Sequence, residues 1–233
     1  MTADDRLAGY FEFIRSKADF RTSHGFEISV DQVHPLLLGH QRAIVQWAVR
    51  GGRRAIFAKF GLGKSLMQIE TVRIIRERHG GRALIVCPLG VRQEFRIDAE
   101  KVGVETRFVR WDHELDPDPD LPVIYLTNYE SIRDGRLNAD GFTVVSLDEA
   151  SVLRSFGSDT YQTFTQVMRD VPFRFVATAT PSPNRFKELI HYGGFLGVMD
   201  TGQALTRFFK RDSTKANKLT LFPHKEAEFF LWL

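Results

Sequence analysis

A short glycine-rich segment of the chain has the residue types that bind phosphate groups. The run Ala58-Lys59-Phe60-Gly61-Leu62-Gly63-Lys64-Ser65 follows a short apolar stretch and precedes a helical pattern, the strand–loop–helix context of a phosphate-binding loop. The glycines let backbone N–H groups curl around phosphates, the lysine reaches the β and γ oxygens, and the hydroxyl can hold Mg²⁺. The sequence therefore predicts nucleotide binding by this loop, with an accidental glycine turn before a helix as the alternative. The predicted contacts are Ala58, Gly61, Leu62, Gly63, Lys64 and Ser65.

A pair of carboxylates supplies the second half of such a site. Asp148 and Glu149 directly follow the apolar run at residues 144–147. We expect Asp148 to hold Mg²⁺ together with Ser65, and Glu149 to orient and deprotonate a water molecule, so that Glu149 and Lys64 are the catalytic residues. An Asp-Glu pair after a strand is by itself often accidental, but its presence beside a phosphate-binding loop favours a function.

A third cluster lies behind another apolar run. Thr178, Ala179 and Thr180 follow residues 173–177, and their small side chains and hydroxyls suit a site that senses the γ-phosphate. A plain turn at the end of a strand is the commoner explanation of such a segment.

The elements that must position these residues alternate between strands and helices. Because the strand-like runs are largely apolar and are separated by helical patterns, they predict an α/β fold with a mostly parallel central sheet and helices on both faces. The expected strands are at 55–58, 83–87, 123–126, 144–147 and 173–177, and the expected helices at 4–19, 38–50, 66–80, 91–102 and 158–170.

Composition excludes several other classes of protein. The chain has 233 residues, of which 43% are hydrophobic and 26% are charged. This composition indicates one large folded domain with additional segments, and it argues against a disordered protein and against a membrane-spanning one. Its single cysteine, Cys87, and the absence of a secretory signal favour the cytoplasm. The net charge of +3 includes five carboxylates and no Lys or Arg at 112–120, so the remainder carries +8. Such a surface suits a polyanion, and an ordinary solvated surface of mixed charge is the alternative.

In this order, the three clusters resemble the first RecA-like domain of superfamily 2 helicases and translocases, most closely the Swi/Snf-like branch and its phage and bacterial relatives. That family has alanine at the position of Ala58, and it has histidine where this chain has Ser151. The resemblance implies that Gln41 pairs with adenine and that Thr178, Ala179 and Thr180 couple hydrolysis to movement on nucleic acid. It also implies a nucleic-acid track at two further segments, formed by Pro88, Val91, Arg92, Thr127, Asn128 and Tyr129.

The same resemblance implies cofactors, partners and a domain plan. ATP, Mg²⁺ and a nucleic acid, first of all duplex DNA, are expected, with no membrane partner, in the cytoplasm of a bacterial or phage-infected cell. We expect an N-terminal helical extension at 1–37, a RecA-like domain at 38–200, and a basic segment at 201–233 that leads toward a second RecA-like domain in the same or another chain. Because that second domain supplies arginines to the transition state, the present chain is expected to be half of a two-domain enzyme and to hydrolyse ATP slowly alone.

Two alternatives to a DNA-dependent ATPase remain open. One is a nucleotide-gated nucleic-acid binding module without efficient hydrolysis. The other is a small-molecule kinase, which leaves the adjacent Asp148 and Glu149 unexplained.

The basic stretch at 207–218 carries five cations against Asp212, and it either contacts phosphates or is a solvated surface.

Overall fold

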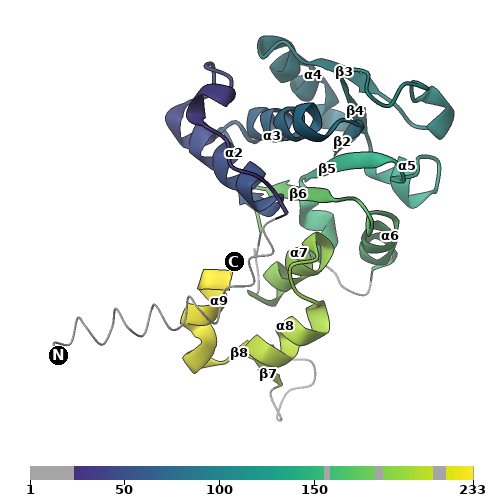
Figure 1. Ribbon diagram of the computed structural model, residues 1–233. Coiled ribbons are helices and arrows are strands. Elements are labelled where there is room, and N and C mark those ends of the chain that lie inside the picture. Colours follow the sequence, from purple (N-terminus) through teal and green to yellow (C-terminus); the bar gives the residue numbers. More distant parts are fainter. Residues whose placement is uncertain (1–23, 155–157, 182–185, 212–218, 233) are drawn as a thin grey trace.

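A computed structural model describes residues 24–154, 158–181, 186–211 and 219–232 of the chain (Figure 1). The helix expected at 4–19 lies outside the described residues. Among those residues, no helix is long and apolar enough to cross a membrane.

The centre of the fold is a six-stranded sheet whose paired strands are all parallel. The strands lie in the order β1-β6-β5-β2-β4-β3. This confirms the predicted parallel sheet. The strands are β1 (Arg53–Phe57), β2 (Arg82–Val86), β3 (Glu105–Phe108), β4 (Val123–Thr127), β5 (Phe142–Asp148) and β6 (Phe173–Thr178).

Helices cover both faces of this sheet (Figure 1). Successive residues of a strand point to opposite faces, and in β2 Leu84 and Val86 enter one apolar cluster while Ala83 and Ile85 enter the other. One face carries α2 (Gly39–Gly51), α3 (Lys64–His79) and α4 (Arg92–Lys101), and the other carries α5 (Tyr129–Arg133), α6 (Asp159–Val167), α7 (Leu189–Leu196), α8 (Thr201–Phe208) and α9 (Glu226–Trp232). Single turns of 3₁₀ helix connect them at Val30–Gln32, Leu89–Val91, Asp112–Glu114, Ala150–Arg154, Phe186–Glu188 and Pro223–Lys225.

The helix boundaries follow from local residues. Gly52 and Gly80 adopt positive φ angles of 69° and 70° directly after α2 and α3, a conformation that glycine adopts without the clash a Cβ atom causes. At the start of α6, the hydroxyl of Ser158 accepts a hydrogen bond from the backbone N–H of Tyr161 at 3.2 Å. These stop and start signals are the ones visible in the sequence.

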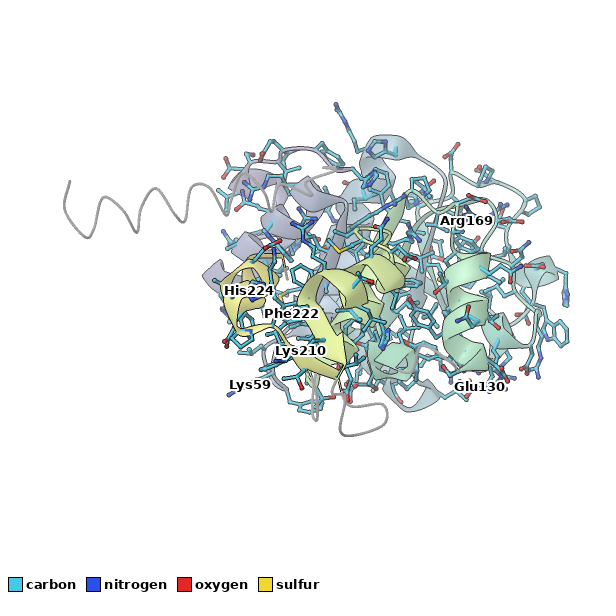
Figure 2. The ribbon with its side chains drawn as sticks, turned by 90° about the horizontal axis from the view of Figure 1, so that it is seen from below. Lys59, Glu130, Arg169, Lys210, Phe222 and His224 are labelled. Atoms are coloured by element: carbon cyan, nitrogen blue, oxygen red, sulfur yellow. The ribbon has the colours of Figure 1, made fainter. Side chains whose placement is uncertain are left out.

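The C-terminal segment packs on the same core as the sheet. Phe208, Phe209 and Phe229 are buried in the apolar cluster that also contains the residues of α7, and a hairpin of β7 (Phe209–Arg211) and β8 (Leu219–Leu221) joins α8 to α9. Seen from below, α8 and α9 lie in front of the sheet (Figure 2). Residues 201–211 and 219–232 are therefore continuous with the core around the central sheet. Their expected role of leading toward a second domain stays a prediction.

The acidic loop at 112–120 is hydrogen-bonded to the beginning of β2. Asp120 accepts a hydrogen bond from the backbone N–H of Gly81 at 2.7 Å, and Arg82 Nη2 donates to the carbonyl of Asp116 at 2.7 Å. Because β2 begins here, the loop lies at the amino ends of the strands, away from the glycine loop.

Candidate active site

The order of the strands brings the three predicted clusters together. β6 lies between β1 and β5, with Phe57 of β1 opposite Thr178 of β6 and Asp148 of β5 opposite Ala177. The glycine loop (Ala58–Ser65), the threonine segment (Thr178–Thr180) and the acidic pair (Asp148 and Glu149) therefore all lie at the carboxyl ends of three adjacent strands. The carboxyl ends of parallel strands are where ligands of open α/β sheets bind.

The glycine loop has the backbone conformation that its glycines allow. Gly61 and Gly63 have φ angles of 81° and 74°, and Gly63 directly precedes the first residue of α3, Lys64. A Cβ atom on Gly63 would lie 2.3 Å from Nε2 of Gln41, so that a side chain is excluded here by both conformation and space. Ala58 begins the loop with its N–H donated to the carbonyl of Thr178 at 3.3 Å, and Leu62 is exposed. The amino end of α3 thus faces the space that phosphates would occupy.

Lys64 lies beside an exposed aromatic ring of the same loop. Its Nζ is 4.9 Å from the ring centroid of Phe60, a side chain that is 77% exposed. A cation over an aromatic face is attracted by the ring. This contact holds the ammonium group at the surface of the loop.

Gln41, the predicted adenine contact, is buried against the glycine loop. Its Oε1 accepts the N–H of Leu38 at 2.9 Å, and its Nε2 donates to the carbonyl of Leu62 at 3.1 Å. The structure thus places Gln41 at the loop, and its pairing with adenine stays a prediction.

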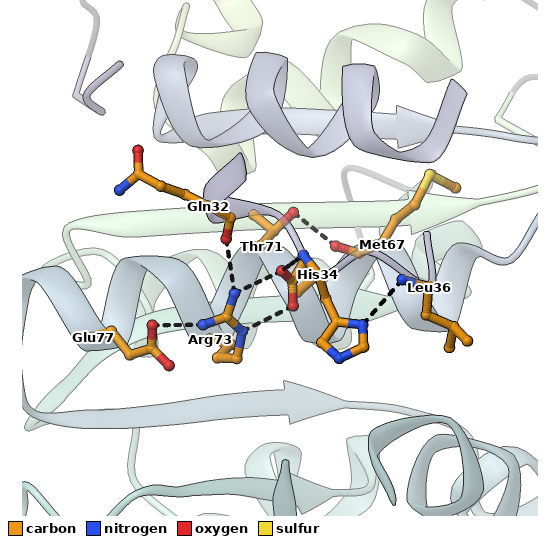
Figure 3. Close-up of polar contacts among 8 residues, drawn as sticks. Gln32, His34, Leu36, Met67, Thr71, Arg73 and Glu77 are labelled. Atoms are coloured by element: carbon orange, nitrogen blue, oxygen red, sulfur yellow. Dashed lines mark hydrogen bonds and ion pairs between the residues drawn. The ribbon is translucent and has the colours of Figure 1, made fainter. Parts of the chain in front are cut away.

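The segment before α2 is anchored on α3 by a buried ion pair (Figure 3). The fully buried Glu70 accepts the N–H of His34 at 2.6 Å and two N–H groups of Arg73 at 2.9 and 2.6 Å. Arg73 also donates to the carbonyl of Gln32 at 3.1 Å and to Glu77 at 2.6 Å. No pattern in the sequence predicts this network, which fixes the segment leading to Gln41.

Asp148 is held from α3. Nε2 of Gln68 donates to Oδ1 of Asp148 at 2.8 Å, and Oε1 of Gln68 accepts the hydroxyl of Ser146 at 2.7 Å. Burial raises the pKa of Asp148, against the opposing effects of the Gln68 hydrogen bond and the nearby charge of Lys64. Sequence analysis did not identify Gln68. The only sign of its role in the sequence is that this amide side chain lies between the apolar residues Met67 and Ile69 of a predicted helix.

Glu149 has the only positive φ among the non-glycine residues that the structure describes, 49°. Such a conformation is costly for a residue with a side chain and is often found at functional sites. Its Oε1 accepts the hydroxyl of Thr178 at 3.0 Å and that of Thr180 at 3.5 Å, while the N–H of Thr180 donates to Oγ1 of Thr178 at 3.1 Å. The partly exposed Ala179 lies between the two threonines. The acidic pair and the threonine segment are therefore directly linked.

Ser65, the other predicted metal ligand, donates its hydroxyl to Asp98 of α4. Asp98 also forms an ion pair with Lys101 at 2.7 Å, and no motif in the sequence predicts a role for Asp98. Across the described ranges, no group of three or more His, Cys, Asp and Glu side chains is arranged to hold a metal. Mg²⁺ usually takes only one or two protein ligands and completes its shell with phosphates and water, so Ser65 and Asp148 fit it if the hydroxyl turns away from Asp98.

The predicted nucleic-acid residues differ in how available their side chains are. Thr127 is buried and donates to the carbonyl of Val109 at 2.7 Å, Asn128 donates to Glu130 at 2.6 Å, and the hydroxyl of Tyr129 donates to the carbonyl of Asp148 at 2.6 Å. These three side chains therefore donate hydrogen bonds to other groups of the same domain.

The other predicted track residues lie at the start of α4. Arg92 is exposed, with its guanidinium 4.8 Å from the ring of Phe108, and Pro88 and Val91 are partly buried beside it. Of the predicted track, Arg92 has the side chain best placed to reach a phosphate. Contact with nucleic acid stays a prediction for all six residues.

The chain is similar to known proteins in structure, with no match in sequence to a protein family or a curated protein. The SWI2/SNF2 ATPase core of Sulfolobus solfataricus in complex with dsDNA is similar with a TM-score of 0.65 and 18% identity, over 78% of this chain and 41% of that one. The SWI2/SNF2 ATPase core domain of the same organism gives 0.61 and 18%, over 79% and 42%. The UvsW helicase from bacteriophage T4 gives 0.53 and 15%, over 67% and 57%.

These relatives agree with the observed sheet and its helices. The chain spans between 41% and 57% of their lengths. At such low identity the likeness establishes the fold and leaves activity to be argued from the site. The chain has the RecA-like α/β fold of helicase and SWI2/SNF2 ATPase cores.

Proposed function

We propose that the chain is the ATP-binding motor domain of a DNA-dependent ATPase, a helicase or duplex translocase. The observation that carries this proposal is the placement of Glu149. It follows β5 and is bonded to Thr178 at the end of β6, the strand next to the one that leads into the glycine loop. A carboxylate base poised beside a phosphate-binding loop suits the attack of water on a terminal phosphate.

In this proposal each part of the site has one task. Backbone N–H groups at Gly61, Gly63 and the start of α3 bind the phosphates, and Lys64 neutralises their charge. Ser65 and Asp148 hold Mg²⁺, which supplies charge stabilisation to the phosphoryl group. Glu149 takes the proton of the attacking water, and Gln41 contacts adenine.

The threonine segment would transmit the state of the nucleotide. Because Thr178 and Thr180 both donate to Glu149, a change in the position of this carboxylate on ATP binding alters contacts of the strand end that carries them. We propose that this segment couples hydrolysis to movement on nucleic acid.

The nucleic-acid partner and the second domain belong to the same proposal. Support for duplex DNA comes from a structural neighbour that was determined with dsDNA. A second RecA-like domain, in the same or another chain, would complete the site, so slow hydrolysis is expected without it. The single cysteine and the expected partner make the cytoplasm the proposed location.

The direct test is phosphate release by the longest natural form of the protein, measured without nucleic acid and with duplex DNA, single strands or RNA. We expect ATP hydrolysis that duplex DNA stimulates and that Lys64→Ala abolishes. Binding of ATP and DNA without any stimulated release would instead support the nucleotide-gated binding module. A Ser65 hydroxyl that stays bonded to Asp98 when ATP is bound would favour that alternative, because it would not be free to hold Mg²⁺.

DNA binding is expected to weaken steeply as salt increases. Contacts to backbone phosphates release counterions, so that the logarithm of the binding constant falls with the logarithm of salt concentration by about 0.9 per phosphate contacted. Arg92→Ala is expected to reduce this slope by about one contact, with little dependence on DNA sequence. Fluorescence anisotropy of labelled duplex DNA at several salt concentrations measures both effects.

The control is Arg169→Ala, since Arg169 is exposed in the turn before β6 and so lies at the amino ends of the strands, whereas Arg92 follows the carboxyl end of β2. This change should leave the slope as it is. Affinity that does not vary with salt, or equal slopes for the two variants, would contradict the proposed track.

A further inference from the structure

The hydroxyl of Tyr129 is bonded to the residue that precedes the candidate base. Tyr129 is the first residue of α5 and follows the end of β4 by one residue, and its hydroxyl donates to the backbone carbonyl of Asp148 at 2.6 Å. In the sheet, β2 lies between β4 and β5, so the Tyr129 side chain reaches past the carboxyl end of β2 to the end of β5. This contact joins a residue predicted for the nucleic-acid track to the acidic pair.

The carbonyl that Tyr129 binds belongs to the peptide group between Asp148 and Glu149. Because a peptide group is planar, it turns as a unit, and turning it changes ψ of Asp148 together with φ of Glu149. A donor that holds the carbonyl oxygen therefore restrains φ of Glu149. That angle is 49°, a conformation that is costly for a residue with a side chain and persists only where surrounding groups hold it.

The carboxylate of Glu149 is held separately from its backbone. Its Oε1 accepts the hydroxyl of Thr178 at 3.0 Å and that of Thr180 at 3.5 Å. The φ angle sets the direction in which the side chain leaves the end of β5, so relaxation to a negative φ would carry the carboxylate away from these threonines. Glu149 is thus restrained at its carboxylate by β6 and at its peptide group by Tyr129.

Tyr129 is itself fixed by groups other than the acidic pair. Its ring packs against the apolar cluster on its face of the sheet, with its centroid 5.3 Å from that of Phe164 in α6. The preceding residue, Asn128, is buried, and its Oδ1 accepts the hydroxyl of Ser131 at 2.5 Å. The hydroxyl of Tyr129 is therefore presented from a packed support, as a group that must hold another residue in place requires.

We propose that Tyr129 is a positioning residue whose hydroxyl holds the peptide group of Glu149 in the orientation that directs the carboxylate at the attacking water. The inference rests on the proposed ATPase, in which Glu149 is the base. Tyr129 transfers no proton and acts only through Glu149. Proton transfer requires hydrogen-bond distance between the base and the water, and a displacement of about 1 Å can cost roughly 10²-fold in rate.

The test is Tyr129→Phe in the longest natural form of the protein, because this change removes the hydroxyl and keeps the ring beside Phe164. We expect kcat for phosphate release to fall by roughly 10–100-fold. Binding of a fluorescent ATP analogue and of duplex DNA should be unchanged, since the hydroxyl is bonded within the domain. Equilibrium binding and steady-state phosphate release, with and without duplex DNA, measure these quantities.

The matched control is Tyr125→Phe, which removes a hydroxyl from another buried tyrosine of the same strand. The hydroxyl of Tyr125 accepts the N–H of Asp116 at 3.1 Å, in the acidic loop at the amino ends of the strands. Its loss should leave kcat as in the wild type. Thermal unfolding of both variants sets a temperature for the assays at which each protein is folded.

A double variant separates action through Glu149 from an independent role of Tyr129. Glu149→Gln removes the base, so adding Tyr129→Phe should lower kcat no further, because residues that act as a unit have non-additive effects. Independent effects would multiply.

Three results would overturn this inference and leave the proposed ATPase intact. They are equal kcat values for Tyr129→Phe and the wild type, an equal loss in Tyr125→Phe, and a further loss in the double variant as large as that of Tyr129→Phe alone. A wild-type protein that releases no phosphate with any nucleic acid would overturn the proposed function, and this inference with it.

Discussion

Replacing Glu149 with glutamine is expected to reduce ATP turnover by roughly 10²–10⁴-fold, the usual contribution of a general base. Glutamine has nearly the same shape, and its amide oxygen can still accept the hydroxyl of Thr178, whose distance to Glu149 is 3.0 Å. It cannot take a proton from water. Nucleotide affinity should therefore change little, and the loss should appear in kcat. Steady-state phosphate release and equilibrium binding of a fluorescent ATP analogue, with the longest natural form of the protein, measure the two quantities.

The matched control for this variant is Glu105→Gln. Glu105 is an exposed residue at the beginning of β3, the strand at the far edge of the sheet from β1, so the same chemical change there should leave turnover unaltered. If Glu149→Gln hydrolysed ATP at the wild-type rate, the assignment of the base, and with it the proposed ATPase, would fail.

Replacing Glu70 with alanine is expected to lower the free energy of unfolding by about 3 kcal/mol. The change removes the acceptor of three N–H groups, one on His34 and two on Arg73. The Arg73 side chain is only 22% exposed, and water replaces a lost partner poorly at such a site. Urea unfolding followed by circular dichroism measures the loss.

Glu77→Ala is the control, because Glu77 binds the same arginine from a side chain that is 55% exposed. An exposed pair one helical turn apart contributes about 0.3–0.5 kcal/mol. Equal losses for the two variants would show that burial of Glu70 does not decide the strength of the network. Glu70→Gln, which keeps one acceptor, should give an intermediate loss.

Much of the fold was predictable because its strands are buried on both faces. Residues 83–87 and 144–147 are apolar runs, and both are strands of the sheet. The strand β3 was not anticipated, since Glu105, Thr106 and Arg107 give it a polar composition. As an edge strand it has one neighbour and needs less apolar surface. The helix α7 was also missed because Gly193 and Gly194 lower its intrinsic helix propensity, and its formation depends on burial against the sheet.

The candidate site likewise has one part that the sequence predicts and one part that it does not. The glycine loop and the Asp148-Glu149 pair are local patterns whose meaning depends on a strand before them, and the structure supplies those strands. The contacts of Gln68 with Asp148 and of Ser65 with Asp98 depend on which faces of α3 and α4 meet the strand ends. The spacing of residues along the chain does not specify these tertiary contacts between helices and strand ends. The positive φ of Glu149 is equally a result of tertiary packing.

The position of β1 also has a consequence for synthesis of the protein. β1 is an edge strand whose one partner is β6, and the Arg53 side chain at its start donates to the carbonyl of Pro172, which lies 119 positions later in the sequence just before β6. At about 5–20 residues per second, the ribosome needs roughly 6–24 s to make the intervening chain. During that time the strand that carries the phosphate-binding loop has neither edge paired, a state open to association with other chains. The nascent protein is therefore most vulnerable before residue 178 leaves the ribosome, and the nucleotide site assembles among the last parts of the domain.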